Sequence, residues 1–268
     1  MRYAQIIMGL KDSGKSTYCK LMAKYAESKG RKMRIVNLDP SPGELVYDHP
    51  IADIREVVKT NEAEEGENST QSSASGFELA LGYILDNPDW LFGSIGELKD
   101  GDYILFDCPG ESQYYIHSKS MKVFAAMLVV KSFRTCGVFV RDGRMGLNGY
   151  NFIGSCLTPL TSYINLSIPH VGLMMKIDLL TDDDKSKLQL FINSDIKDVL
   201  RYENSRYKNF QCDGQPELAK LCSSAVAILE GHSMVRKKYY ALDIKDEESF
   251  KGFLDIVDDL LGIILEED

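Results

Sequence analysis

The sequence predicts a three-layer α/β fold in which helices cover both faces of a mostly parallel central sheet. Short β-rich runs alternate along the chain with longer segments of helical periodicity, as in βαβ units. The first run, residues 3–8, leads directly into Gly9-Leu-Lys-Asp-Ser-Gly-Lys-Ser16, which has the Gly-x4-Gly-Lys-Ser spacing of a phosphate-binding loop. Together these observations indicate a P-loop NTPase fold.

The expected strands are short, apolar and spread over the whole chain. They are residues 3–8, 34–38, 103–106, 135–140, 170–175 and 239–242. A crossover helix is expected over residues 15–28, ending at Gly30. Apolar residues at helical spacing over residues 250–261 predict a last helix that packs on the core.

Length and composition favour a single domain over residues 1–268. A chain of this size with 44% hydrophobic residues buries a full core. Residues 60–75 are rich in Glu, Ser and Thr, so we expect a mobile surface insertion there. The net charge of −9 argues against direct nucleic-acid binding, so macromolecular partners are expected to be proteins.

The cysteines and the apolar segments indicate a cytoplasmic protein. Six cysteines occur without a Cys-x-x-Cys pair, a pattern suited to a reducing compartment. No apolar stretch reaches the length of about 18 residues that a membrane span needs, and the first residues do not form a signal peptide. No membrane partner is expected.

The P-loop predicts the phosphate and metal contacts. Backbone N–H groups of such a loop and the positive end of the following helix cradle a di- or triphosphate. Lys15 is expected to reach the β- and γ-phosphates, and Ser16 to place its hydroxyl on Mg²⁺. The residues assigned to nucleotide binding are Lys11, Asp12, Ser13, Gly14, Lys15, Ser16 and Thr17.

Two carboxylates are expected at the same edge of the sheet, where parallel strands end. Asp107 follows the run 103–106 and is assigned to Mg²⁺, and the backbone of Gly110 is placed near the γ-phosphate. Asp39 follows the run 34–38 and is assigned to orienting water; alternatively, Asp39-Pro40 simply turns the chain.

A third motif, Lys176-Ile-Asp178, follows the run 170–175 and has the spacing of a guanine-recognition motif. The Lys176 stem lies along the purine face in this interpretation, while Asp178 accepts hydrogen bonds from the amino and imino groups of guanine. Adenine lacks those donors. The alternative is a solvated ion pair after a strand.

Taken together, these motifs resemble the GPN-loop GTPases over nearly the whole chain and in the same order. The motifs that carry the resemblance are Gly9–Ser16, Val36-Asn-Leu-Asp-Pro40, Asp53-Ile-Arg55, Phe106-Asp-Cys-Pro-Gly110, Met175-Lys-Ile-Asp-Leu-Leu180 and residues 242–249. Asp246-Glu-Glu-Ser249 is similar to the third eukaryotic paralogue, with the second as the alternative.

The resemblance implies a G-protein-like domain that binds GTP or GDP with Mg²⁺, hydrolyses GTP and forms a homodimer or a heterodimer with a paralogue. It further implies a role in assembly and nuclear import of RNA polymerase II, with RNA polymerase II subunits or assembly factors as partners. A cytoplasmic protein that shuttles to the nucleus follows from this role.

The sequence departs from the family at the residues expected to act in hydrolysis. The Gly-Pro-Asn tripeptide is replaced by Ser72-Ser-Ala74, and the Gln-x-Glu after Gly110 reads Glu111-Ser-Gln113. Met175 stands where the family has Asn or Ser. We therefore expect Lys15, Asp39, Gly110, Glu111 and Gln113 to support slow or partner-dependent hydrolysis.

Two other functions are compatible with the sequence. A non-hydrolysing, nucleotide-bound interaction subunit is favoured by the missing Gly-Pro-Asn. A P-loop kinase would need phosphate-clamping arginines, for which Arg141 and Arg144 are the candidates, but it leaves Lys176 and Asp178 without a role.

Overall fold

The central sheet has seven strands, and every pair is parallel. The computed structural model describes residues 1–57, 73–97, 99–209, 216–231 and 239–263. The strands are β1 (Arg2–Gly9), β2 (Met33–Asn37), β3 (Ala52–Asp53), β4 (Tyr103–Asp107), β5 (Phe133–Asp142), β6 (His170–Met175) and β7 (Tyr239–Ala241), in the order β3-β2-β4-β1-β5-β6-β7. The predicted α/β fold with its parallel sheet is confirmed.

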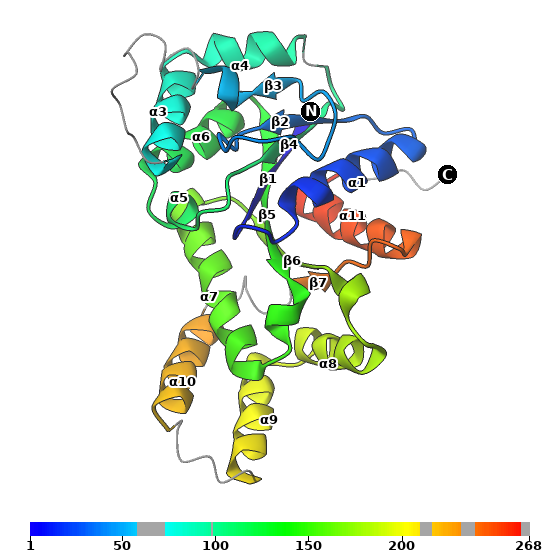
Figure 1. The fold of residues 1–268 in the computed structure, drawn as a ribbon. Helices are drawn as coiled ribbons and strands as arrows, with labels where there is room; N and C mark the ends of the chain where they lie inside the picture. Colours follow the sequence, from blue (N-terminus) through cyan, green and yellow to red (C-terminus); the bar gives the residue numbers. More distant parts are fainter. Residues whose placement is uncertain (58–72, 98, 210–215, 232–238, 264–268) are drawn as a thin grey trace.

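Helices cover both faces of this sheet (Figure 1). One face carries α1 (Lys15–Ser28) and α11 (Glu247–Leu261), and the other carries α3 (Ser73–Asp86), α4 (Pro88–Ile95), α5 (Gln113–Ile116) and α6 (Lys119–Val130). Beyond the β6 side lie α7 (Gly149–Leu166), α8 (Asp182–Asn193), α9 (Ile196–Asn209) and α10 (Pro216–Gly231), and two short 3₁₀ helices, η1 (Gly143–Gly146) and η2 (Ile177–Leu179), follow β5 and β6.

Strand β1 runs through the middle of the core and is buried on both faces, as a central parallel strand should be. Ala4, Ile6 and Met8 pack in the cluster under α3 and α6, whereas Ile7 packs under α1 and α11. Gln5 is the polar exception. Its amide donates to the Tyr103 hydroxyl at 2.7 Å and accepts from the Tyr18 hydroxyl at 2.6 Å, so all three buried groups are satisfied.

An ion pair holds the end of α1 against α11. Arg31, just after α1, donates two hydrogen bonds of 2.5 and 2.9 Å to the buried carboxylate of Asp258 in α11. The bidentate geometry compensates for the removal of the carboxylate from water. This pair fixes the last helix beside the helix that follows the P-loop.

All six expected strands and both expected helices are present, with β5 longer than predicted. Strand β3 was not predicted. Of the expected insertion at about 60–75, residues 60–72 lie outside the described part of the chain, and Ser73 begins α3. The replaced tripeptide Ser72-Ser-Ala74 straddles this limit.

The described cysteines are buried: Cys19, Cys108, Cys136, Cys156 and Cys222. Among the helices that the structure describes, none combines the length and apolar character needed to cross a membrane.

Candidate functional site

The P-loop connects the end of β1 to the start of α1 and depends on Gly9. Gly9 has φ of 144°, and a Cβ there would lie 2.2 Å from the carbonyl oxygen of Val140 on β5. Any side chain would push the loop off the sheet. The Ser13 N–H donates to the Leu10 carbonyl at 3.2 Å, which closes the loop into a tight turn.

Two polar side chains of this loop are buried and face inward. Lys15 is 7% exposed, and its ammonium donates to the Leu10 carbonyl at 3.1 Å. Within the described residues, the buried Ser13 Oγ has no hydrogen-bond partner. A buried hydroxyl without a partner and a buried ammonium are arranged for an anion.

Asp107 ends β4 at the same edge and is almost fully buried. Burial raises the pKa of this carboxyl to about 6, although the nearby hydroxyls of Ser16 and Tyr47 and the charge of Lys15 lower it. Its Oδ2 accepts from the Tyr47 hydroxyl at 2.9 Å, whereas its Oδ1 has no hydrogen-bond partner in the described part of the chain.

This arrangement fits Mg²⁺. The ion prefers hard oxygen ligands and keeps several waters, so one carboxylate oxygen and one hydroxyl are sufficient protein ligands. Asp107 Oδ1 is the carboxylate oxygen without a hydrogen-bond partner among the described residues, and Ser16 carries a hydroxyl near the same carboxyl. The described residues contain no cluster of three or more His, Cys, Asp or Glu side chains that would hold a metal without a nucleotide.

The loop after β4 lies directly against the P-loop at Gly110. A Cβ on Gly110 would lie 2.7 Å from the Cα of Lys11, so a side chain there would separate the two loops. Glu111 follows and is half-buried, while Gln113 begins α5 and is exposed. The contact places Gly110 against the P-loop backbone, and Glu111 is the residue next to it in the chain.

Asp39 follows β2, and the structure shows the turn contact that the sequence suggested as the alternative for this residue. Its carboxylate accepts from the N–H of Ser41 at 2.9 Å, which is a turn contact, and its charge is close enough to raise the pKa of Asp107. Asp39 is half-buried at the predicted edge.

Three polar residues around Asp39 belong to the motifs that carry the family resemblance, but the sequence did not predict a role for them. The buried Asn37 amide donates to Asp53 Oδ1 at 2.8 Å and to the Asp39 carbonyl at 3.1 Å. Asp53 in turn accepts from Arg55 at 2.9 Å, and despite its burial, its hydrogen bonds with Arg55 and Asn37 lower its pKa. This network fixes the ends of β2 and β3 beside Asp107.

Lys176 connects the Lys176-Ile-Asp178 motif to the P-loop. It has φ of 62° directly after β6, its ammonium donates to the Asp12 carbonyl, and it lies 3.3 Å from Asp142 Oδ2. Asp142 ends β5, and its hydrogen bonds with Arg144 and then Lys176 lower its pKa to about 2. Asp178 lies half-buried in η2, two residues further on.

Met175 has an apolar role in this site. It is 2% exposed, and its Cβ would lie 3.4 Å from a Cβ placed on Gly14. The side chain therefore packs against the start of α1, where the resemblance implied a small polar residue.

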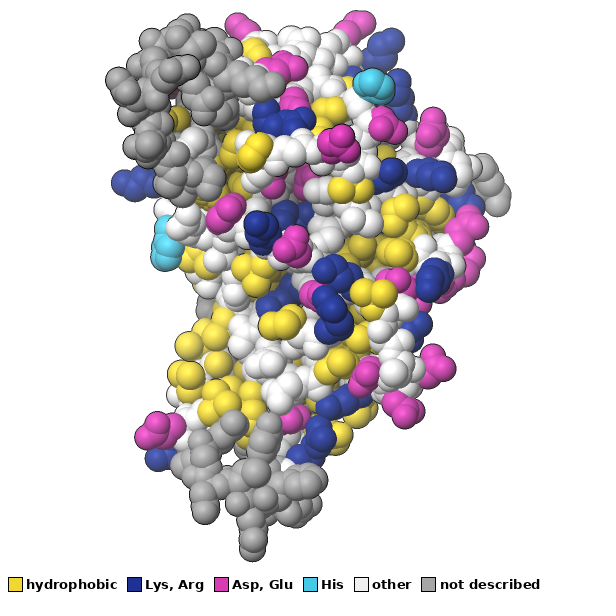
Figure 2. Space-filling model, viewed as in Figure 1, with side chains coloured by type: hydrophobic (Ala, Val, Ile, Leu, Met, Phe, Trp, Pro, Cys, Tyr) yellow, Lys and Arg dark blue, Asp and Glu magenta, His cyan; other side chains and the backbone are white. Residues whose placement is uncertain are grey.

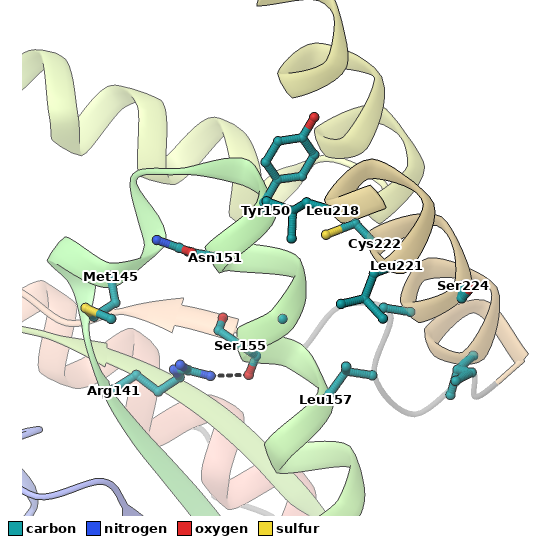
Figure 3. A pocket seen from close by; sticks show the side chains of 13 residues that line it. Arg141, Met145, Tyr150, Asn151, Ser155, Leu157, Leu218, Leu221, Cys222 and Ser224 are labelled. Carbon is teal, nitrogen blue, oxygen red and sulfur yellow. Dashed lines mark hydrogen bonds between the residues drawn. The ribbon is translucent and has the colours of Figure 1, made fainter. Parts of the chain in front are cut away.

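The two arginines that a kinase would need both have partners within the protein. Arg144 pairs with Asp142, and Arg141 donates to the Ser155 carbonyl inside a pocket of about 490 Å³ between α7 and α10 (Figure 3). Figure 2 shows apolar side chains gathered over these two helices, and the exposed ones include Leu221 and Ile228. None of the residues assigned to phosphate or base binding lines this pocket.

Comparisons with known proteins agree with the geometry. Residues 7–263 match the protein family described as a conserved hypothetical ATP binding protein. The chain is 33% identical over 258 residues to GPN-loop GTPase 3 of Xenopus tropicalis and 34% identical over 260 residues to that of Danio rerio, in each case covering 96% of this chain and 87% of the relative.

A solved structure has the same fold over nearly its full length. A GTPase from Pyrococcus abyssi in its apo form superposes with a TM-score of 0.74 at 18% identity, covering 98% of both chains. The P-loop, the strand-end carboxylates and the extent of these matches lead to one conclusion: the chain belongs to the GPN-loop GTPase family.

Proposed function

We propose that this protein binds GTP and GDP with Mg²⁺ and hydrolyses GTP. The proposal rests on one observation: three features lie at the same edge of the sheet. They are the P-loop, the Asp107 oxygen that has no hydrogen-bond partner among the described residues, and the Lys176 side chain that donates to the Asp12 carbonyl. The relatives named GPN-loop GTPase 3 support GTP over ATP, although the family description mentions ATP.

The residues of the site have different proposed roles in phosphoryl transfer. Lys15 and the loop amides hold the phosphate oxygens, and Ser16 and Asp107 would hold Mg²⁺, which supplies neutralisation of the phosphate charge when bound. Asp39 and Glu111 are the candidate groups for orienting the attacking water. Gly110 lets the loop after β4 approach the phosphates without a side chain between them.

Asp178 is the proposed guanine-selective group, and an asparagine at this position should change the preferred base. The carboxylate only accepts hydrogen bonds, which matches the N1–H and the amino group of guanine. In Asp178→Asn, the amide N–H₂ can instead donate to the 2-oxo group of xanthine while its oxygen accepts from N1–H. We expect the affinity for GDP to fall by at least about 100-fold and that for XDP to rise by a similar factor.

Calorimetric titration of both nucleotides against the wild type and the variant measures this exchange. Asp183→Asn is the matched control, since Asp183 is an exposed carboxylate five residues further along, in the first turn of α8. Loss of GDP binding without any gain of XDP binding would mean that Asp178 supports the structure of the loop and does not read the base.

Hydrolysis is proposed to be slow or dependent on a partner. Ser and Ala at the Gly-Pro-Asn position cannot supply the amide of Asn, and Glu111 can accept but not donate a hydrogen bond to water. A non-hydrolysing nucleotide-bound interaction subunit remains the second candidate because of this replaced tripeptide.

Dimerisation with a second copy or a paralogue is also proposed, from the family resemblance. Exposed apolar side chains on α3 and α6 are compatible with an interface, among them Leu79, Tyr83, Val123 and Val130. The proposed role in assembly and nuclear import of RNA polymerase II, the polymerase subunits or assembly factors as partners, and a cytoplasmic location with shuttling to the nucleus rest on the resemblance alone.

A further inference from the structure

Tyr47 reaches the proposed Mg²⁺ site from a loop that the sequence analysis did not assign to it. The residue lies between β2 and β3 and is 4% exposed. Its hydroxyl donates to Asp107 Oδ2 at 2.9 Å, and the side-chain amide oxygen of Asn37, Oδ1, is 3.4 Å away. A loop tyrosine is thereby bonded to the carboxylate that ends a central strand.

Contacts on either side of Tyr47 hold this loop in place. Lys20 of α1 donates to the Val46 carbonyl at 2.8 Å, and Arg55 donates to the Gly43 carbonyl at 2.8 Å. The Tyr47 ring itself packs in the apolar cluster under α1 and α11. Contacts of the neighbouring backbone and of the ring therefore also hold Tyr47 in this position.

The bond leaves the two oxygens of Asp107 unequal. Oδ2 is occupied by the Tyr47 hydroxyl, whereas Oδ1 is buried and has no hydrogen-bond partner in the part of the chain that the structure describes. A hydroxyl has one proton, so it can fix one carboxylate oxygen and leave the other available. Partners of this kind orient metal-binding carboxylates in other metal sites.

We propose that Tyr47 is a positioning residue that holds the Asp107 carboxylate with Oδ1 available for Mg²⁺. The inference rests on the proposed function, since it assigns a role toward the metal of that site. Tyr47 does not touch the nucleotide in this account; it acts through Asp107. Its effect is therefore on the affinity for Mg²⁺ and not on the affinity for the nucleotide without metal.

Tyr47→Phe keeps the packed ring and removes only the hydroxyl. We expect the Mg²⁺ concentration that half-saturates the increase in GDP affinity to rise by about 10- to 100-fold, the usual cost of losing such an orienting partner. GDP affinity in excess chelator should stay within about twofold of the wild type. The measurement is a fluorescence titration with a labelled GDP over a series of free Mg²⁺ concentrations.

Tyr18→Phe is the matched control. Tyr18 lies in the same apolar cluster as Tyr47, and the substitution also removes one buried tyrosine hydroxyl. That hydroxyl donates to Gln5 and not to Asp107. A purely structural role of Tyr47 would give both variants the same loss of thermal stability and the same unchanged Mg²⁺ requirement, and this result would overturn the inference.

A double-variant cycle with Asp107→Asn tests whether Tyr47 acts through Asp107. If Tyr47 acts through Asp107, Tyr47→Phe has no further effect on the Mg²⁺ requirement once Asp107 is replaced. An equal effect in both backgrounds would contradict the assignment. A wild type whose GDP affinity does not respond to Mg²⁺ would overturn the proposed function and the inference with it, whereas a responsive wild type with an unaltered Tyr47→Phe variant would overturn the inference only.

Discussion

Replacing Lys15 with alanine is expected to lower GTP affinity by at least about 100-fold and any measured hydrolysis by about 100- to 1000-fold. Lys15 is the one buried ammonium among the residues assigned to the P-loop, and its ammonium donates to the Leu10 carbonyl of the same loop. A phosphate oxygen is a stronger partner for an ammonium than that carbonyl, because it is charged.

Lys24→Ala is the control for this prediction, since Lys24 is an exposed lysine on the same helix. Calorimetry with a non-hydrolysable GTP analogue and single-turnover hydrolysis give the two quantities. Equal affinities for Lys15→Ala and Lys24→Ala would show that the loop does not hold the phosphates.

Asp107→Asn is expected to have opposite effects on stability and on function. The folded-state pKa of Asp107 is raised to about 6 by burial, compared with an ordinary value of 3.8. Folding therefore favours the protonated carboxyl, and at pH 7 the buried charge costs the nucleotide-free protein about 2–3 kcal/mol of unfolding free energy. Asparagine removes that cost but cannot serve as an anionic ligand for Mg²⁺.

The stability difference should depend on pH in a defined direction. Because the pKa of Asp107 is higher in the folded than in the unfolded protein, its protonated carboxyl does not reduce the free energy of unfolding below about pH 4. The free energy of unfolding then falls as the pH rises from 4 through 6 and the buried carboxyl ionises. The asparagine variant does not have this loss, so its advantage over the wild type should be absent near pH 4 and greatest at pH 7. Binding of Mg²⁺ requires the ionised carboxylate, so wild-type affinity for Mg²⁺-nucleotide should increase over the upper part of this range.

Denaturant unfolding of both proteins without nucleotide, at several pH values, measures the difference. Asp259→Asn, which removes an exposed carboxylate on α11, should show no such pH-dependent gap. An Asp107→Asn protein that is less stable than the wild type at pH 7, or that keeps a Mg²⁺-dependent nucleotide affinity, would contradict the assignment of Asp107.

The parts of the fold that the sequence predicted are those with a strong local pattern. The P-loop joins a buried strand to a helix with fixed glycine spacing, and the apolar runs read as strands because parallel strands are buried on both faces. The assignment of Lys176 to the same edge as the P-loop also followed from the order of strands. Its bond to the Asp12 carbonyl places it there in the structure.

The features of the fold and of the site that the sequence did not predict depend on contacts between segments that are far apart in the chain. Strand β3 has only two residues, Ala52 and Asp53, too few to show a period, and it exists through its pairing with β2. Tyr47 stands in a polar loop, and nothing around it in the sequence indicates that its hydroxyl bonds to Asp107, 60 residues away. The packing of Met175 on Gly14 likewise appears only once β6 lies beside the P-loop.

The most direct test of the guanine-nucleotide site is a calorimetric titration of the purified, nucleotide-stripped wild-type protein with GDP and with ADP, both in Mg²⁺. The geometry at Asp178 and the P-loop predicts that GDP binds at least about 100-fold more tightly than ADP. Equal affinities for the two nucleotides, or no binding of either, would contradict the account.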